Sequence, residues 1–345
     1  MKNSQPLTLI GAIPSPYTRK MIALLRYRHI PYSIIWGDPK QVLSAMKIAP
    51  PKVALLPTVL LPTNEGELEA VCDSTPIIRR LEEKYEQRSV IPEDPALAFI
   101  DYLLEDFGDE WCTKYMFHYR WAFEADADNA GTLLPYMYKV DMPEQVFHQA
   151  KVSISERQIS RLGVVGSNPT TAPLIDTSYR RFLQALESLL KSRPFILGSR
   201  PSACDFAIYG QLTQLVGFDP TSRKIAHQTA SRVVAWTNLM EDQCGLDVSS
   251  IQWDTLDAGN HGLHCLLSEV GRVYVPALMA NASAMERGED TWEAAIDGER
   301  WSQQTFPYQV KCAMWLRERY ANLKQIDRVR VDSLLKGTGC EALFN

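Results

Sequence analysis

Several features that would point directly to a function are missing from this chain of 345 residues. It contains no C-x-x-C pair, so the sequence indicates neither a zinc knuckle nor a dithiol redox centre. No window approaches the roughly 18 consecutive apolar residues of a membrane span, and no cleavable signal peptide is evident. We therefore expect no membrane partner.

Runs of lysine and arginine are also absent, and the net charge is −5. Because nucleic-acid binding needs a basic stripe or patch, we expect no nucleic-acid partner. The seven cysteines are odd in number and irregularly spaced, which favours reduced thiols in a cytoplasm over a disulfide framework. No metal is expected, because His261, His264 and Cys265 have no further regularly spaced ligand.

What is present is the composition of an ordinary soluble globular protein, with 46% apolar and 22% charged residues. The length allows two domains, or one domain with a large elaboration. A polar, proline-rich break at 91–95 marks the boundary, so we predict domains at 1–92 and 93–345.

The first domain has the pattern of a small α/β unit. Residues 7–13 predict a buried strand, Pro16 fits the first turn of a helix, and 32–36 predict a second strand, which together make a βαβ unit. A short helix at 39–48, a hairpin of strands at 55–61 and 67–72, and a helix from Asp73 complete the predicted domain.

The second domain reads as helical throughout, with long apolar stripes at helical spacing. Its tail beyond about 250 is less regular. There we predict helices at 290–302, 308–323 and 328–336, the last one closed by Gly337.

Three segments of the first domain point to one binding place. Ser15 stands at a predicted helix start, where free N–H groups and the helix dipole favour an anion. Pro57 opens a strand, and in the cis form its peptide bond would turn the backbone of Leu56 towards a ligand. At the next helix start, Asp73 can bind an ammonium and Ser74 a carboxylate. A small zwitterionic peptide with a thiol would satisfy all three.

Each of these residues also has a purely structural interpretation. Ser15 and the pair Asp73 and Ser74 could be ordinary helix caps, which are common. Pro57 could be a trans proline at a sheet edge. The three segments together favour the functional interpretation over these alternatives.

The same segments resemble the thioredoxin-like domain of the glutathione transferase superfamily. From Ser15 the chain reads S-P-Y-T-R-K, which resembles the start of the serine-type classes. From Leu56 it reads L-P-T-V, similar to the cis-proline strand V-P-x-L, with leucine in place of valine. From Asp73 it reads D-S-T-P-I, which resembles the clamp for the γ-glutamyl end of glutathione.

The second half of the chain carries a fourth motif. From Phe195 it reads F-I-L-G, and from Pro201 it reads P-S-A-C-D-F, which resembles the superfamily segment with a buried capping box. Cys204 stands where the pattern has alanine. We assign Ser202 and Asp205 to structure. The stretch 120–175 and the chain beyond about 250 fall outside the resemblance, so the C-terminal part is a large elaboration.

The resemblance implies a thioredoxin-like domain followed by an all-helical domain, with glutathione as cosubstrate and a homodimer as assembly. Ser15 would stabilise the glutathione thiolate for attack on a hydrophobic electrophile, by conjugation, ether cleavage, dehalogenation or isomerisation. Glutathione would be bound by Tyr17, Lys52, Leu56, Pro57, Asp73 and Ser74. The electrophile would lie between the domains, near Trp111, Tyr115, His118 and Tyr119. A non-catalytic binding or assembly protein with the same fold is the alternative hypothesis.

Overall fold

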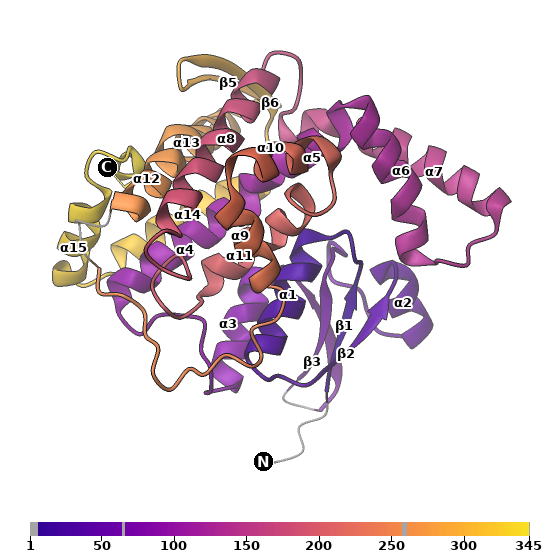
Figure 1. The fold of residues 1–345 in the computed structure, drawn as a ribbon, viewed down its shortest axis with the longest axis horizontal. Helices are drawn as coiled ribbons and strands as arrows, with labels where there is room; N and C mark the ends of the chain where they lie inside the picture. Colours follow the sequence, from indigo (N-terminus) through magenta and orange to yellow (C-terminus); the bar gives the residue numbers. More distant parts are fainter. Residues whose placement is uncertain (1–5, 64–65, 257–260, 345) are drawn as a thin grey trace.

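The computed structural model describes residues 6–63, 66–256 and 261–344. Figure 1 shows a small domain built around a sheet, with the first helices of the chain, and a larger helical part packed against one side of it. This is the predicted order of a thioredoxin-like domain followed by a helical domain.

The N-terminal sheet has four strands in the order β2-β1-β3-β4, in which β1 and β2 are parallel and the other neighbours are antiparallel. The elements are β1 (Leu7–Gly11), α1 (Pro16–Tyr27), β2 (Tyr32–Trp36), α2 (Pro39–Met46), β3 (Thr58–Pro62), β4 (Leu68–Cys72) and α3 (Ser74–Lys84). Every predicted element of this domain is present, with ends that differ by a few residues.

The turn between β1 and α1 is fixed by short-range contacts. The Ser15 side chain caps α1 by accepting from the Thr18 N–H, and Pro16 occupies the first turn. The Ala12 N–H donates to the Thr18 hydroxyl. A side chain at Gly11 would collide with Thr18, because a Cβ there would lie 2.5 Å from a Thr18 methyl carbon. The sequence therefore places the start of α1 directly against the end of β1.

The helical domain follows a linking segment and contains a projecting arm. Its helices are α4 (Pro95–Glu110), α5 (Cys112–Ala122), α6 (Glu124–Tyr138), α7 (Glu144–Ile159), η1 (Leu162–Val165), α8 (Ala172–Leu189), α9 (Ala203–Leu215), α10 (Pro220–Thr229) and α11 (Ser231–Leu239). Helices α6 and α7 form the arm, which extends away from the body in Figure 1. The predicted capping box of Ser202 and Asp205 opens α9.

The C-terminal extension covers the outer side of the helical domain. It contains α12 (His261–Glu269), η2 (Val270–Tyr274), α13 (Val275–Glu286), β5 (Thr291–Ile296), β6 (Glu299–Gln304), α14 (Pro307–Ala321), α15 (Gln325–Leu335) and η3 (Cys340–Leu343). The predicted helices at 308–323 and 328–336 are present, and Gly337 follows the second with a positive φ of 78°.

The helix predicted at 290–302 is wrong, because this segment is the hairpin β5–β6. The two residues between the strands, Asp297 and Gly298, both have positive φ angles, of 52° and 80°. An Asp-Gly pair is typical of such two-residue turns. Trp292 and Ile296 on one strand, with Trp301 on the other, are buried, while most of the residues between them are exposed.

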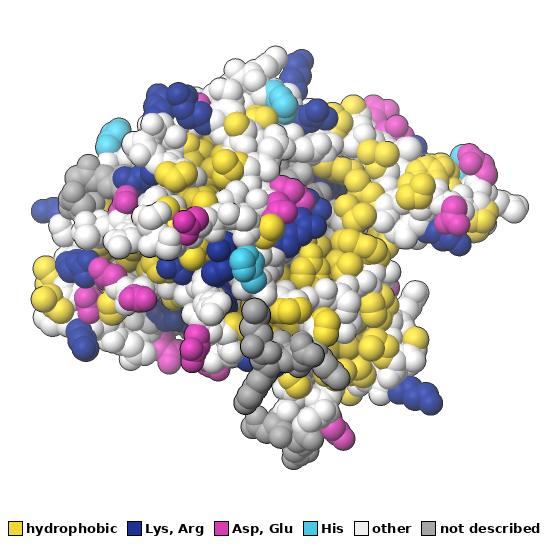
Figure 2. Space-filling view, turned by 60° about the horizontal axis from the view of Figure 1, so that its bottom comes forward, with side chains coloured by type: hydrophobic (Ala, Val, Ile, Leu, Met, Phe, Trp, Pro, Cys, Tyr) yellow, Lys and Arg dark blue, Asp and Glu magenta, His cyan; other side chains and the backbone are white. Residues whose placement is uncertain are grey.

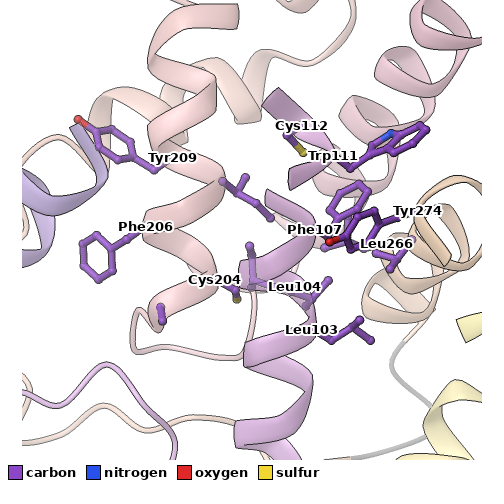
Figure 3. Packing of buried hydrophobic residues seen from close by; sticks show 14 of the residues in the cluster. Leu103, Leu104, Phe107, Trp111, Cys112, Cys204, Phe206, Tyr209, Leu266 and Tyr274 are labelled. Atoms are coloured by element: carbon purple, nitrogen blue, oxygen red, sulfur yellow. The ribbon is translucent and has the colours of Figure 1, made fainter. Parts of the chain in front are cut away.

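One continuous hydrophobic core runs through both domains and the extension. In Figure 3, Leu103, Leu104 and Phe107 of α4 point between α9 and the extension, where Leu266 and Tyr274 meet them. The extension is thus part of the same core as the helical domain, and α4 lies at its centre.

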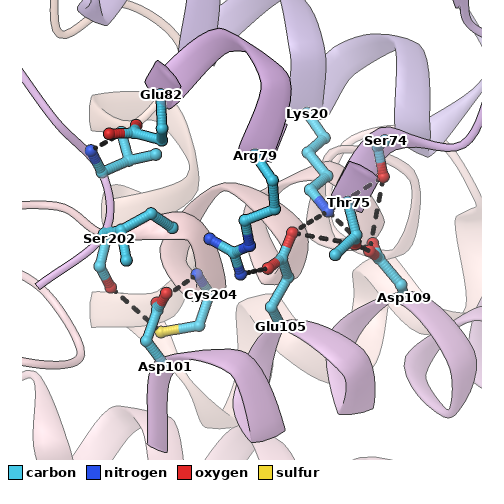
Figure 4. Close-up of polar contacts among 12 residues, drawn as sticks. Lys20, Ser74, Thr75, Arg79, Glu82, Asp101, Glu105, Asp109, Ser202 and Cys204 are labelled. Atoms are coloured by element: carbon cyan, nitrogen blue, oxygen red, sulfur yellow. Dashed lines mark hydrogen bonds and ion pairs between the residues drawn. The ribbon is translucent and has the colours of Figure 1, made fainter. Parts of the chain in front are cut away.

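A buried ammonium joins the two domains. Lys20 on α1 is fully buried, and its Nζ lies 2.9 Å from Glu105 and 2.6 Å from Asp109, both on α4. It also donates to the Ser74 hydroxyl at 3.0 Å, as Figure 4 shows. Burial alone would lower the pKa of Lys20, but the charges of Asp109 and Glu105 outweigh it and raise the pKa above its ordinary value. Lys20 is therefore charged at neutral pH.

Close packing of α1 on α9 depends on a glycine. A Cβ added to Gly210 would lie 2.5 Å from the backbone oxygen of Pro16 and 3.1 Å from Lys20. The first turn of α1, next to Ser15, therefore rests on α9 at a distance that only glycine permits.

We expect Gly210→Ala to destabilise the protein. Alanine improves helix propensity by about 1 kcal/mol, but the backbone of α1 must move to admit the methyl group. We expect a net loss of about 1–2 kcal/mol in the free energy of unfolding, measured by urea denaturation. Gly245→Ala is the control, because a Cβ at Gly245 meets no atom within 4 Å. Equal stability of the two variants would contradict the packing role of Gly210.

We also expect Lys20→Met to be strongly destabilising, because it leaves Glu105 and Asp109 buried without their shared cation. The cost should be about 3–5 kcal/mol in the free energy of unfolding. The matched control is Arg80→Met, which removes an exposed ion pair with Glu69 and should cost less than about 1 kcal/mol. A loss at Lys20 as small as that at Arg80 would show that the cluster does not join the domains.

Candidate functional site

The register of the sheet brings the three predicted segments to one end of it. Thr58 on β3 pairs with Ile10 on β1 and with Cys72 on β4. One residue further along, Pro57 therefore lies between the end of β1 and Asp73. Since neighbouring strands are about 4.8 Å apart, the ends of β1, β3 and β4 together span about 10 Å, and Ser15 lies in the turn that directly follows β1. An extended peptide of three residues has about this length.

Ser15 stands at the β1 side of this row. Its backbone is extended, with φ −89° and ψ 117°, and its hydroxyl oxygen lies 3.2 Å from the Thr18 nitrogen, from which it accepts a hydrogen bond. The side chain is half-buried. The cap uses an oxygen lone pair and leaves the hydroxyl proton for donation. Capping and anion binding are thus compatible at Ser15.

Pro57 is preceded by a cis peptide bond, as the functional interpretation predicted for Leu56 and Pro57. Pro57 is buried, and Leu56 is partly exposed. Among the residues that the structure describes, none forms a backbone hydrogen bond with Leu56. The N–H and C=O of Leu56 are therefore available to a ligand backbone.

Asp73 and Ser74 open α3 at the β4 side of the row, but both already have partners. Asp73 has a φ of 79° and caps Thr75 with one carboxylate oxygen, while the other accepts a hydrogen bond from Tyr308 on α14. The Ser74 side chain is buried and accepts from Lys20. Burial raises the pKa of Asp73, and the hydrogen bond from Tyr308 opposes this rise.

Tyr17 contacts the helical domain, whereas Lys52 lies beside α2. The Tyr17 hydroxyl donates to the backbone oxygen of Asp109 at 2.8 Å, at the C-terminal end of α4, where helix carbonyls lack partners. Burial and the charges of Glu110 and Asp109 raise the pKa of Tyr17, so its phenol is neutral. Lys52 is exposed and lines a surface hollow of about 530 Å³ between α2 and the segment 48–54 that follows it.

The four residues assigned to the electrophile lie in the core of the helical domain. Trp111, Tyr115 and Tyr119 are fully buried. Trp111 and Tyr115 form a hydrogen-bonded group with Ser178, and Trp111 packs on Trp301 of the extension. These rings have no surface that a second substrate could touch.

His118 and Tyr119 have polar partners inside the domain. His118 Nδ1 lies 2.7 Å from the Ser167 hydroxyl, and burial lowers the pKa of His118 to about 4. It is therefore neutral at physiological pH. Tyr119 donates to Asp176. His118 is thus a packed, hydrogen-bonded histidine of the helical domain and does not face a substrate.

The partly exposed positions at the end of α4 and on α5 are different residues. Glu110, Thr113 and Phe117 are the partly exposed positions there, and Thr113 lies beside the Tyr17 phenol. The apolar stripe along α4 and α5 is the face that packs into the core. A substrate could reach only the partly exposed face beside this stripe. Figure 2 shows hydrophobic side chains gathered between the projecting arm and the N-terminal domain.

No group of three histidine, cysteine or acidic side chains in the described residues is placed to hold a metal ion. None of the described helices is long and apolar enough to cross a bilayer.

Several solved structures resemble this chain at low identity. A glutathione S-transferase from Methylobacterium radiotolerans, in complex with glutathione sulfonate, is 18% identical over 73% of this chain and 98% of its own, with a TM-score of 0.41. FzlA from C. crescentus is 17% identical over 76% and 99%, with a TM-score of 0.42. A glutathione transferase from Burkholderia graminis, with two glutathione molecules bound per subunit, is 19% identical over 72% and 91%, with a TM-score of 0.42. No conclusion about function rests on these similarities.

Two family models identify the chain. The model of the glutathione S-transferase N-terminal domain matches residues 9–89, and that of the C-terminal domain matches residues 160–240. No curated protein sequence matches the chain significantly. The first model covers the sheet with Ser15, Pro57 and Asp73, and the second covers α8 and α9 with the capping box. In this order and in these places, the two domains show that the chain belongs to the glutathione S-transferase superfamily.

Proposed function

We propose that the protein is a glutathione-dependent transferase in which Ser15 stabilises the glutathione thiolate for attack on a hydrophobic electrophile. The observation that carries this proposal is the row of Ser15, Pro57 and Asp73 at one end of the sheet. It offers a hydroxyl at a helix start, an unpaired backbone and a carboxylate over the length of a tripeptide.

The chemistry requires a lower thiol pKa. An unperturbed thiol has a pKa of about 8.5, and lowering it by about two units requires roughly 2.7 kcal/mol of preference for the anion. A helix N-terminus supplies about 0.3–1 kcal/mol, and a hydrogen bond to a charged group about 1.5–3 kcal/mol. Ser15 and the first turn of α1 together reach this value, and Ser15 acts as a donor without losing its proton.

The other ligand contacts follow from the same row. The backbone of Leu56 beside Pro57 would pair with the cysteinyl backbone, and Asp73 would bind the γ-glutamyl ammonium. The N–H groups at the start of α3, with Ser74, would bind the adjacent carboxylate. Lys52 would meet the glycine carboxylate, and Tyr17 would border the thiol.

For the electrophile we propose the surface of Thr113 and Phe117 on α5, next to Tyr17, in place of the buried Trp111 and Tyr115. The reaction is one of conjugation, ether cleavage, dehalogenation or isomerisation. These reactions share thiolate activation and differ in the electrophile, so the fold does not choose among them.

A second function is favoured by the contacts of the clamp. Asp73 is already bonded to Tyr308, and Ser74 to Lys20. In this chain the two residues proposed to bind the glutamyl end of glutathione already have hydrogen-bond partners within the protein. This favours a non-catalytic binding or assembly protein that kept the fold. The projecting arm adds surface that a protein partner could use.

Location and assembly belong to the same proposal. All seven cysteines are free, which fits a reducing compartment such as the cytoplasm. We propose a homodimer in solution, as the resemblance implies, and sedimentation of the full chain tests it.

We expect Ser15→Ala to bind glutathione but to raise the pKa of the bound thiol by about 1–2 units, because the thiolate loses its hydroxyl donor. The measurement is the ultraviolet absorbance of the thiolate as a function of pH in the complex. Turnover of an aromatic electrophile at neutral pH should fall about 10- to 100-fold.

Ser15→Thr is the matched variant, because threonine keeps both the cap and the hydroxyl. It should retain most of the activity. Equal turnover of wild type and Ser15→Ala would remove Ser15 from the catalytic role. Glutathione binding without any turnover of the wild-type chain would favour the non-catalytic alternative.

A further inference from the structure

The C-terminal extension touches the glutamyl end of the proposed peptide site. Tyr308, in the first turn of α14, donates its hydroxyl proton to one carboxylate oxygen of Asp73. The other oxygen accepts from the Thr75 N–H. The two residues are 235 positions apart in the sequence and are both half-buried. Asp73 is therefore held in place from outside the N-terminal domain.

Aromatic rings surround the Tyr308 side chain. The ring of Phe306 lies 6.3 Å from that of Tyr308, and the ring of Trp315 lies 6.0 Å from it, nearly at right angles. Both outer rings remain about 37% exposed. Gln309, the next residue of α14, donates to Glu110 at 3.3 Å. The extension thus places two neutral donors on carboxylates outside it: Tyr308 donates to Asp73, and Gln309 donates to Glu110. The aromatic rings of Phe306 and Trp315 lie beside Tyr308.

No lysine or arginine of the described residues forms an ion pair with Asp73. The charge of Lys20 acts on Asp73 and lowers its pKa, but the two side chains form no ion pair. The ammonium of Lys20 is bound directly by Glu105, Asp109 and Ser74. Asp73 therefore has a neutral donor in Tyr308 and no ion pair among the described residues. Because each carboxylate oxygen has two lone pairs, Asp73 can accept from Tyr308 and from a ligand ammonium together.

We propose that the C-terminal extension completes the amino-group subsite of the peptide site, with Tyr308 as the positioning residue for Asp73. The phenol holds the carboxylate ionised and oriented, so that the site selects peptides with a free α-ammonium. This inference rests on the proposed binding of glutathione and extends it to a part of the chain outside both family models.

The test compares two peptides on the full-length protein by calorimetry: glutathione, and glutaryl-cysteinyl-glycine, which differs only in lacking the amino group. Wild type should bind glutathione at least about tenfold more tightly, because the ammonium makes a charged hydrogen bond with Asp73. In Tyr308→Phe this ratio should fall by about three- to tenfold, with weaker binding of glutathione and little change for the other peptide.

The control is Tyr320→Phe, which removes the same kind of phenol–carboxylate bond, to Asp332, elsewhere in the extension. It should leave the ratio unchanged, and thermal unfolding verifies that each variant is folded. An unchanged ratio in Tyr308→Phe would overturn the inference while leaving the proposed function intact. Tighter glutathione binding by Tyr308→Phe would also overturn it, by showing that the phenol blocks the site. A wild-type chain that binds neither peptide would refute both.

Discussion

The arrangement of the site depends on one buried ammonium. Lys20 lies on the same helix that Ser15 caps, and it holds Ser74 at the start of α3 and two carboxylates of α4. Through these contacts, the helix with the proposed thiolate donor, the helix with the proposed clamp and the centre of the helical domain share one fixed geometry. The neighbouring ion pair of Arg79 with Glu105 extends the network along α3. A loss of register in any of the three helices would leave a charge buried without a partner.

Much of the N-terminal domain could be predicted from its sequence because its signals are local. Prolines mark the starts of α1 and α2, caps stand at the helix starts, and a short polar turn separates β3 from β4. The cis bond before Pro57 was conditional in the sequence interpretation and is present. The sequence predicts from helix starts and a strand proline that Ser15, Pro57 and Asp73 serve one binding place, and the pairing of β3 with both neighbours brings their segments to one end of the sheet. The roles of these residues remain proposals.

Two predictions are wrong for different reasons, the first because a local turn signal was outweighed and the second because tertiary packing decides which face is buried. The segment 290–302 was assigned to a helix although Asp297 and Gly298 form a strong hairpin signal, and buried residues alternate with exposed ones along β5. The apolar stripe of α4 and α5 predicts a binding face that includes Trp111 and Tyr115. Tertiary packing against α8 and the extension buries this stripe completely. The contact of Tyr308 with Asp73 joins residues 235 positions apart, and no spacing in the sequence predicts it.

The single core that joins both domains to the extension has a consequence for how the chain can be divided. Its buried side chains run without a break from β1 to the last residues described, so the extension is not an appendage on a finished domain. A fragment cut near residue 250 would leave α4 and α8 with wide apolar faces open to water, and it would tend to aggregate. Evolution or engineering that shortens this protein must therefore redesign those faces at the same time.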